Sequence, residues 1–172
     1  MPTITEGLAE LKTIAARLAK KKQFVGSQLI READRLDPLD KQGGSMNVLK
    51  SEMQAIHDLE ERIVSIRSAI NRANASTKVS IGETTRTVEQ WLIWRREVSR
   101  GQVEFLGGIR QKIDQVRARD PYNRGSKDEP GFIVNLDEKK LGTDTEHLVQ
   151  ILGELDGKLS VVNATTAIEL EA

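Results

Sequence analysis

Apolar side chains near the start of the chain recur three or four positions apart, as on one face of a helix. They are Ile4, Leu8, Leu11, Ala15, Leu18, Val25, Leu29 and Leu36. This spacing predicts an amphipathic helix from Thr3 to about Leu36. Thr3 and Glu6 have the capping-box spacing at its start, and Pro38 disfavours helical geometry just beyond its end.

A second stripe follows the turn-forming residues 37–45 and continues to about Ala73. Its apolar residues are Met46, Leu49, Met53, Ile56, Ile63, Ile66 and Ile70. Two helices of similar length with a short connection form an antiparallel hairpin. Because both stripes repeat close to the heptad spacing, we expect coiled-coil-like packing along this hairpin.

The second half of the chain predicts two more helices of the same kind. The first begins at Thr87, which has the capping-box spacing to Gln90, and ends near Arg119, before Pro121. Its apolar residues are Val88, Trp91, Leu92, Val98, Phe105, Ile109, Ile113 and Val116, and those of the last helix are Leu141, Leu148, Ile151, Leu152, Leu155, Leu159 and Val162. Three glycines inside the first of these helices indicate a kink or a close helix crossing.

Each predicted hairpin is followed by the same short motif. Residues 74–81 read NASTKVSI and residues 163–170 read NATTAIEL, so both fit N-A-S/T-T-x-V/I-x-I/L. Asn74 and Asn163 stand at the expected helix ends, and asparagine tolerates the left-handed geometry of a helix C-cap. The motif therefore indicates an internal repeat of two helical hairpins.

The second part of each motif has the alternation of a strand. Val79 follows Thr77 by two positions, and Ile168 follows Thr166 in the same way. We expect the two strands to pair with each other in a small sheet, alone or together with the apolar residues 132–134. Removal of the last of these strands is then expected to destabilise the fold.

These features together predict a mainly α protein. We expect four long amphipathic helices arranged as two antiparallel hairpins in a coiled-coil-like bundle, with short strands after the second and fourth helices. Residues 1–172 are expected to form a single domain. Its two halves, residues 3–81 and residues 82–172, would each be a helical hairpin followed by a short strand.

Several segments of the chain share the motifs of a known family. They are residues 70–77 (INRANAST), residues 82–84 (GET), a following capped helix with Arg95 or Arg96, residues 155–156 (LD) and residues 163–166 (NATT). They resemble the septicolysin-like family of small helical proteins, over roughly residues 50–170. The resemblance implies a mostly helical, oligomeric protein. No segment has the character of a pore-forming toxin, so the resemblance is not extended to that activity.

The composition excludes several classes of chemistry. The 172 residues include no cysteine and only two histidines, which rules out disulfides, thiolate metal sites and a cysteine nucleophile. The histidines stand in Gln54-x-x-His57 and Asp144-x-x-His147, which lack the paired glutamates of a di-iron bundle. Since no nucleophile motif and no phosphate-binding loop occurs, we expect neither a cofactor nor an enzymatic activity.

Charge is balanced over the whole chain and unbalanced along it. The 26 basic and 26 acidic residues give a net charge of zero, which argues against general binding to nucleic acid or to a membrane. Residues 86–127 nevertheless carry 10 basic and 5 acidic side chains, and residues 128–172 carry 3 and 10. We expect the basic third helix and the acidic C-terminal part to attract each other, within one subunit or between subunits.

Five residues of the third helix are candidates for an interface. Trp91 lies on the apolar stripe and Trp94 lies at its margin, where an aromatic side chain suits a protein contact. Arg95, Arg96 and Arg100 form a basic cluster next to them. This cluster indicates a solvated helix face or, alternatively, a site for an anion.

Four amphipathic helices in a chain of this length leave apolar surface for contacts with other copies. We therefore expect a non-enzymatic structural or scaffolding subunit that self-assembles, for example a phage or prophage virion component. The alternative is a binding module that sequesters a small anionic ligand or a partner protein. The sequence contains no export signal and no membrane-spanning stretch, so the expected location is the cytoplasm, or the virion if the protein is phage-encoded.

Overall fold

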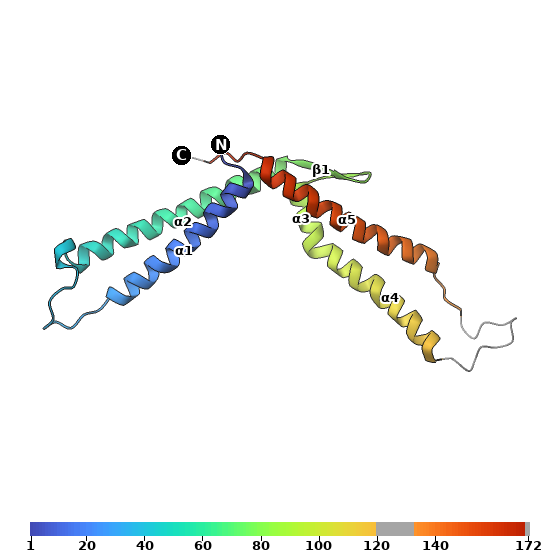
Figure 1. Ribbon diagram of the computed structural model, residues 1–172, viewed down its shortest axis with the longest axis horizontal. Coiled ribbons are helices and arrows are strands. Elements are labelled where there is room, and N and C mark those ends of the chain that lie inside the picture. Colours follow the sequence, from blue (N-terminus) through green and yellow to red (C-terminus); the bar gives the residue numbers. More distant parts are fainter. Residues whose placement is uncertain (120–132, 171–172) are drawn as a thin grey trace. The chain divides into compact units, whose positions relative to one another are not determined.

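The computed structural model describes residues 1–119 and 133–170 and is mainly helical, as the apolar stripes predict (Figure 1). The helices are α1 (Ile4–Gln28), the 3₁₀ turn η1 (Asp40–Gln42), α2 (Ser45–Ser76), α3 (Val88–Ile93), the π-helix η2 (Trp94–Ser99), α4 (Arg100–Arg119) and α5 (Glu138–Thr165), and the strands are β1 (Lys78–Ile81) and β2 (Thr84–Thr87). The chain divides into two compact units, Met1–Asn74 with Val161–Ala172 and Ala75–Ser160, which we name the first and the second unit.

In the first unit α1 and α2 run antiparallel (Figure 1). Arg62 on α2 forms a two-point ion pair with Glu10 near the start of α1, at 2.8 and 3.3 Å, and Lys21 near the end of α1 reaches Glu52 at 2.7 Å. The start of α1 therefore lies beside the second half of α2, and the end of α1 lies beside the first half of α2. The buried core of this unit consists of Ile4, Ile14, Leu18, Ile56, Ile66, Ala69, Ile70 and Ile168.

Helix α1 is shorter than its stripe predicted. It ends at Gln28 instead of near Leu36, and the last apolar residues of the stripe are solvent-exposed, 65% for Leu29 and 96% for Leu36. The register of the ion pairs places Gln28 level with Ser45, where α2 begins. A helix of this kind is stabilised mainly by packing of its apolar face against a partner. No partner helix within the described residues faces residues 29–36, so the predicted extension of α1 to Leu36 is wrong.

Asp37 closes the loop between α1 and α2. Its carboxylate accepts hydrogen bonds from the backbone N–H of Leu39, at 2.9 Å, from the backbone N–H of Ser45, at 2.8 Å, and from the Ser45 hydroxyl. These donors, the Ser45 hydroxyl foremost, lower the pKa of Asp37 from its usual 3.8 to about 2, because they stabilise the charged carboxylate. One ionised side chain thus ties the loop to the start of α2.

Asp37→Asn is expected to lower the melting temperature at neutral pH and to change it little near the acid end of the range. A depressed folded-state pKa stabilises the fold above the unfolded value, about 4, and this contribution is lost as the pH falls toward 2. Thermal melts of both proteins across this range measure the difference. Asp34→Asn, at an exposed aspartate of the same loop, is the control. A deficit that does not vary with pH would contradict the role of the Asp37 charge.

Both predicted capping boxes are confirmed. The Thr3 hydroxyl accepts the N–H of Glu6, and the Glu6 carboxylate accepts the N–H of Thr3. Thr87 and Gln90 make the same two hydrogen bonds at the start of α3. Each cap satisfies backbone donors that have no partner within the helix, so these two starts are defined by local chemistry.

The predicted left-handed helix caps at Asn74 and Asn163 are wrong. Both asparagines lie inside their helices, which continue to Ser76 and Thr165, and no described residue other than glycine has a positive φ. A single asparagine is a weak signal for a helix end, and the alanine that follows each one is a strong helix former.

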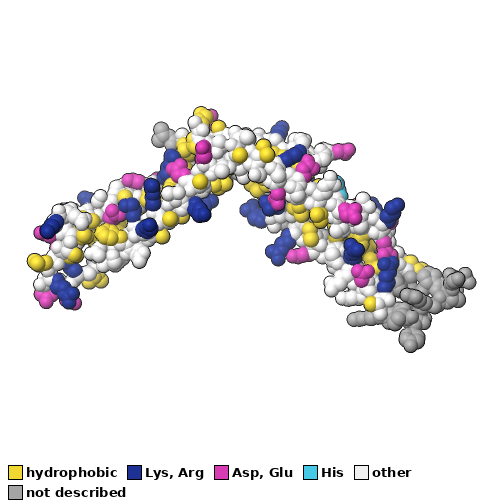
Figure 2. Space-filling view, viewed as in Figure 1, with side chains coloured by type: hydrophobic (Ala, Val, Ile, Leu, Met, Phe, Trp, Pro, Cys, Tyr) yellow, Lys and Arg dark blue, Asp and Glu magenta, His cyan; other side chains and the backbone are white. Residues whose placement is uncertain are grey.

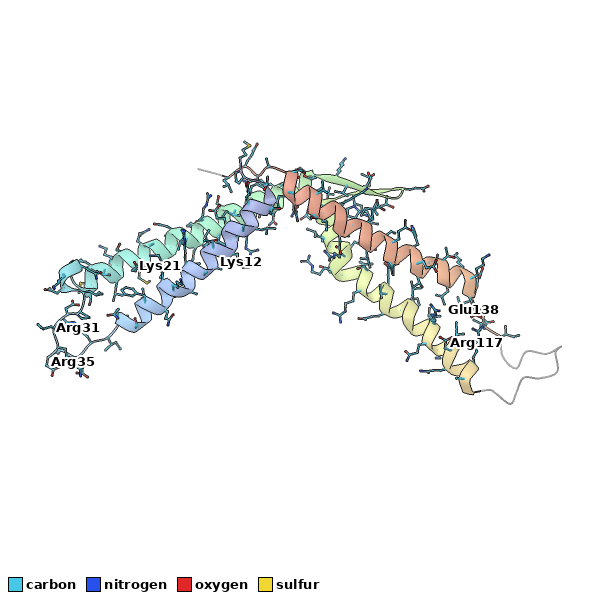
Figure 3. All side chains as sticks on the ribbon, viewed as in Figure 1. Lys12, Lys21, Arg31, Arg35, Arg117 and Glu138 are labelled. Carbon is cyan, nitrogen blue, oxygen red and sulfur yellow. The ribbon has the colours of Figure 1, made fainter. Side chains whose placement is uncertain are left out.

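In the second unit η2 and α4 run antiparallel to α5 (Figure 1). Arg95 in η2 pairs with Asp156 at 2.9 Å, and Arg117 near the end of α4 pairs with Glu138 at 2.6 Å. Figure 3 shows Arg117 and Glu138 facing each other at the far end of the two helices. Part of the expected attraction between the basic third helix and the acidic C-terminal part is therefore satisfied within one subunit. The buried apolar residues of this unit are Val79, Ile81, Val88, Trp91, Leu148, Leu155 and Leu159.

The predicted pairing of the two repeated segments with each other is wrong. β1 pairs antiparallel with β2, with Lys78 opposite Thr87, in a two-stranded sheet. Gly82, with a φ of 54°, makes the turn between them, and a partner so close in the sequence has a small loop-closure cost. The described residues 166–170 are not part of this sheet. Of the expected third strand, residue 132 lies outside the described residues and residues 133–134 form no strand.

Residues 166–168 instead pair with the start of α1. The N–H of Ile4 donates to the carbonyl of Thr166 at 3.0 Å, and the N–H of Ile168 donates to the carbonyl of Pro2 at 2.8 Å. The Ile168 side chain is 1% exposed and packs against Gly7. Because this segment completes the core of the first unit, the chain divides at residues 74 and 160 and not at the expected residue 81.

Ile168→Ala is expected to lower the free energy of unfolding by about 2–4 kcal/mol, because it empties a buried aliphatic site. Val64→Ala is the control, since Val64 is 58% exposed on α2 of the same unit, and its effect should stay within about 0.5 kcal/mol. Urea denaturation followed by circular dichroism measures both values. Equal losses in the two variants would show that Ile168 is not part of the core.

Candidate functional site

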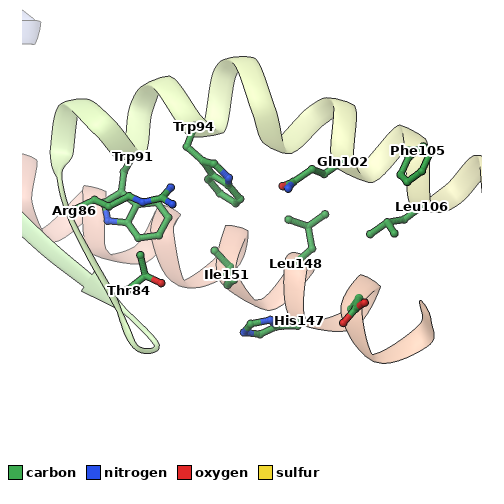
Figure 4. A pocket seen from close by; sticks show the side chains of 11 residues that line it. Thr84, Arg86, Trp91, Trp94, Gln102, Phe105, Leu106, His147, Leu148 and Ile151 are labelled. Carbon is green, nitrogen blue, oxygen red and sulfur yellow. The ribbon is translucent and has the colours of Figure 1, made fainter. Parts of the chain in front are cut away.

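A groove in the second unit is lined by aromatic side chains (Figure 4). It has a volume of about 480 Å³ and lies between α5 on one side and β2, α3 and α4 on the other. Its lining residues are Thr84, Arg86, Trp91, Trp94, Gln102, Phe105, Leu106, Asp144, His147, Leu148 and Ile151. Its lining combines aromatic and aliphatic side chains with polar and charged ones, and a hollow that offers both kinds of group can hold a ligand. We name it the aromatic groove.

Trp91 is the most deeply buried residue of the aromatic groove. Its side chain is 3% exposed, and its indole N–H donates a hydrogen bond of 2.9 Å to the backbone carbonyl of Val79. The ring of Trp94 meets it edge to face, with the centroids 5.5 Å apart and an interplanar angle of 85°. This arrangement is favourable because the positive edge of one ring meets the negative face of the other. Trp91 is thus a core residue, while the half-buried Trp94 keeps surface for a contact.

Arg86 belongs to the aromatic groove, although the apolar stripes did not indicate it. It lies on β2 opposite Val79, and its guanidinium carbon is 4.9 Å from the centroid of the Trp91 ring. An arginine over an aromatic face gains about 0.5–2 kcal/mol of cation–π attraction. Arg86 forms no ion pair with a carboxylate of the described residues. Its signal in the sequence is the strand-like run Thr-Thr-Arg-Thr directly before the helix start.

The arginines of the predicted basic cluster form ion pairs within the second unit. Each of them is close to a carboxylate of the same unit: the pairs are Arg95–Asp156 at 2.9 Å, Arg96–Glu97 at 3.6 Å and Arg100–Glu104 at 2.9 Å. None of these arginines is among the described residues that line the aromatic groove. Because the pairs are solvent-exposed, each contributes little to stability. A role of Trp94 and the three arginines in an interface stays a prediction.

The helix beside the groove contains a π-helical turn that the stripes did not predict. Residues 94–99 adopt this turn, and the buried Ser99 hydroxyl donates to the Arg95 carbonyl at 2.7 Å. An extra residue in the turn shifts the phase of α4 relative to α3. The glycines of α4 follow this turn, and a Cβ added to Gly101, Gly107 or Gly108 would meet no described atom within 4 Å. They therefore mark no close helix crossing.

Helix α4 has no buried residue between Arg100 and Ala118, all of which the structure describes. Its apolar side chains form a half-covered strip, which we name the α4 strip: Phe105, Ile109, Ile113 and Val116. Phe105 is 67% exposed and Val116 is 41% exposed. A second hollow of about 500 Å³ lies along this strip and is lined by Ile109, Lys112, Ile113, Val116, Ile133, Val134, Asn135 and Leu136. α5 therefore covers only one side of the apolar stripe of α4.

The surface seen in Figure 2 mixes basic, acidic and apolar side chains on both units. This face offers no broad basic surface for a phosphate backbone. Among the described residues no group of three or more histidine, aspartate or glutamate side chains is placed to hold a metal ion. Within residues 1–119 and 133–170, every helix is too short or too polar to cross a membrane.

Comparison with protein-family models, curated proteins and solved structures gives no match for this chain. The resemblance to the septicolysin-like family therefore rests on its short motifs and stays a prediction. The aromatic groove, the α4 strip and the paired charges are the features that bear on function.

Trp91→Phe is expected to lower the free energy of unfolding by about 1–3 kcal/mol, because it removes the hydrogen bond from the indole N–H to the Val79 carbonyl and part of a buried ring. Trp94→Phe is the matched control and should cost less, since no hydrogen bond of its indole N–H occurs within the described residues. Denaturation monitored by fluorescence measures both, because the chain has only these two tryptophans. Trp94→Phe, which keeps the buried Trp91, should also show the bluer emission. The reverse order of stabilities would contradict the assignment of Trp91 to the core.

Proposed function

We propose that the protein is a non-enzymatic structural subunit that self-assembles through the α4 strip. The observation that carries this proposal is that α4 has no buried residue between Arg100 and Ala118, all of them described. Removal of apolar surface from water stabilises a contact by about 25 cal/mol per Å². A helix whose stripe is half covered therefore gains by packing against a further surface.

A second copy of the chain is the partner that fits the α4 strip. The chain has no net charge, so two copies do not repel each other as a whole. Both signs of charge lie next to the strip: Lys112 lines the hollow along it, and Arg110 and Glu146 line a neighbouring hollow. A two-fold arrangement can place the basic side chains of one copy beside the acidic side chains of the other. Charges of both signs beside the strip are thus compatible with a contact between two copies.

Exposed apolar side chains of the second unit support an assembled state. Val103, Phe105 and Val116 on α4 are 42%, 67% and 41% exposed, and Ile133 and Leu136 beside the strip are 78% and 55% exposed. A stable protein–protein interface removes about 800 Å² from each partner, and these side chains can contribute to it.

A phage or prophage particle is the most concrete setting for this subunit, because such particles are built from many copies of small proteins held by non-covalent contacts. The septicolysin-like motifs also imply an oligomeric helical protein.

Sedimentation equilibrium over a wide concentration range tests the assembly. The wild-type protein is expected to exceed the monomer mass of 19.2 kDa as its concentration rises. Phe105→Lys should weaken the association by about tenfold or more, because it places a charge in an apolar contact. Val64→Lys, at an exposed valine of α2 outside the strip, should leave it unchanged. A wild-type protein that is monomeric at every concentration would overturn the proposal.

Arg86, which lacks a carboxylate partner within the described residues, favours a second candidate function, the binding of a small aromatic anion in the aromatic groove. Its guanidinium would hold the charge of the ligand, and the half-buried Trp94 would contact the ring. Benzoate is a suitable probe, and Arg86→Gln is the matched variant. A rise in melting temperature with benzoate in the wild type, absent in Arg86→Gln, supports this function. No rise in the wild type rules it out.

A further inference from the structure

Each unit contains the same joint between the start of a capped helix and an extended segment. In the first joint residues 2–4 pair with residues 166–168, and in the second joint residues 86–88 pair with residues 77–79. In both joints the helix begins with a capping box. The extended segment follows the end of a long helix, α5 in the first joint and α2 in the second.

The two joints agree in their hydrogen bonds. The N–H of Ile4 donates to the carbonyl of Thr166 at 3.0 Å, and the N–H of Val88 donates to the carbonyl of Thr77 at 2.9 Å. Each bond joins the first residue of a capped helix to the first residue after a long helix. The internal repeat of the sequence is therefore also a repeat of local structure.

The joints also agree in what they bury. Ile4 and Val88, the first residues of the capped helices, are each 1% exposed. Ile66 on α2 and Leu155 on α5 stand at the same distance before the two repeated motifs, and both are fully buried. A joint of this kind is thus the place where each unit closes its core.

The joints differ in how their two segments are connected. In the second joint Lys78 and Thr87 belong to one hairpin, with a turn at Gly82. In the first joint the corresponding pair, Ala167 and Thr3, lies far apart in the sequence. The first joint is therefore held by contacts alone, without a short covalent connection.

The first joint contains a recess that Ile168 fills. A Cβ added at Gly7 would lie 2.8 Å from the Cδ1 of Ile168 and 3.4 Å from the Cγ2 of Ile66. The glycine thus leaves the space that the isoleucine side chain takes. In the second joint the residue at the position of Gly7 is Trp91, beside the smaller Val79. We name the space over Gly7 and Ile66 the Gly7 recess.

We propose that in the assembled protein residues 166–170 of one copy fill the Gly7 recess of a second copy. This inference rests on the proposed function, because contacts along the α4 strip bring the copies together. The exchanged joint makes the same hydrogen bonds and buries the same Ile168 side chain as the closed joint. The closed and the exchanged joint then differ mainly in the effective concentration of residues 166–170 at the Gly7 recess. Association of two copies raises the effective concentration of one copy's segment at the recess of the other.

The path of the chain supports this exchange. Nearly all of α2 lies in the first unit, and the segment after it lies in the second. Most of α5 lies in the second unit, and the segment after it lies in the first. Each long helix thus already passes its following segment to a different unit. Passing that segment to another copy extends the same arrangement, and within a two-fold pair of copies the exchange is reciprocal.

Single-cysteine variants test the exchange, since the chain has no cysteine of its own. Chains with Thr3→Cys and chains with Ala167→Cys are refolded together at a concentration at which the wild type is assembled, and are then oxidised. These two positions pair in the first joint, so a disulfide between the two kinds of chain requires an exchanged joint. The expected result is a cross-linked dimer, with mass spectrometry identifying the peptide that joins the two positions.

Chains with Lys78→Cys and chains with Thr87→Cys are the matched control. They pair in the second joint, whose two segments are joined by a turn, so no link between chains is expected there. Thr3→Cys and Thr87→Cys each remove the cap of a helix, so their losses of stability are comparable.

The outcomes separate this inference from the proposed function. If the protein sediments as an oligomer and no link forms between positions 3 and 167 of different chains, the exchange is wrong and the assembly stands. If the protein sediments as a monomer, both are wrong. The double variant Thr3→Cys/Ala167→Cys gives an independent reading: disulfide-linked dimers are expected at assembling concentration, and links within single chains alone would overturn the exchange.

Discussion

Two antiparallel helices bury apolar side chains only along the seam between them, and a third segment must cover the seam before it becomes a closed core. In the first unit residues 166–168 supply that segment beside Ile4. In the second unit the β1–β2 hairpin supplies it beside Val88. Fewer side chains are buried farther from these covering segments, and no described side chain of α4 is buried. Helix α1 ends where α2 no longer faces it. The exposed apolar surface of the protein follows from this geometry.

The aromatic groove lies where the covered core of the second unit gives way to the half-covered α4 strip. Trp91 belongs to the core through its hydrogen bond to Val79, and Phe105 belongs to the strip. Trp94 stands between them, in edge-to-face contact with Trp91 at the first position of the π-helical turn. The side chains best suited to a partner or ligand are therefore held by residues that are themselves rigidly packed, which lowers the entropy lost on binding.

Local signals in the sequence predicted the local parts of this structure. The capping boxes at Thr3 and Thr87 and the apolar stripes depend on residues within one or two turns. Both capping boxes are present, and the stripes mark the helices except beyond Gln28, where α1 ends. The repeated motif marked the two helix ends to within two residues, although Asn74 adopts no left-handed cap. The sequence did not predict Arg86 as a residue of the aromatic groove, because its position over Trp91 depends on a strand pairing that the spacing of apolar residues does not show.

The sequence by itself determined where helices form, how they begin and which of their faces is apolar, because these properties follow from periodicity and from hydrogen bonds over a few residues. Only the tertiary structure decided which segments pair. β1 pairs with β2 across a turn at Gly82, while the equivalent residues 166–168 pair with residues 2–4 at the other end of the sequence. Their motifs are nearly the same, so the difference lies in loop closure and in the shape of the receiving core, where Gly7 makes room for Ile168 and Trp91 lies beside Val79.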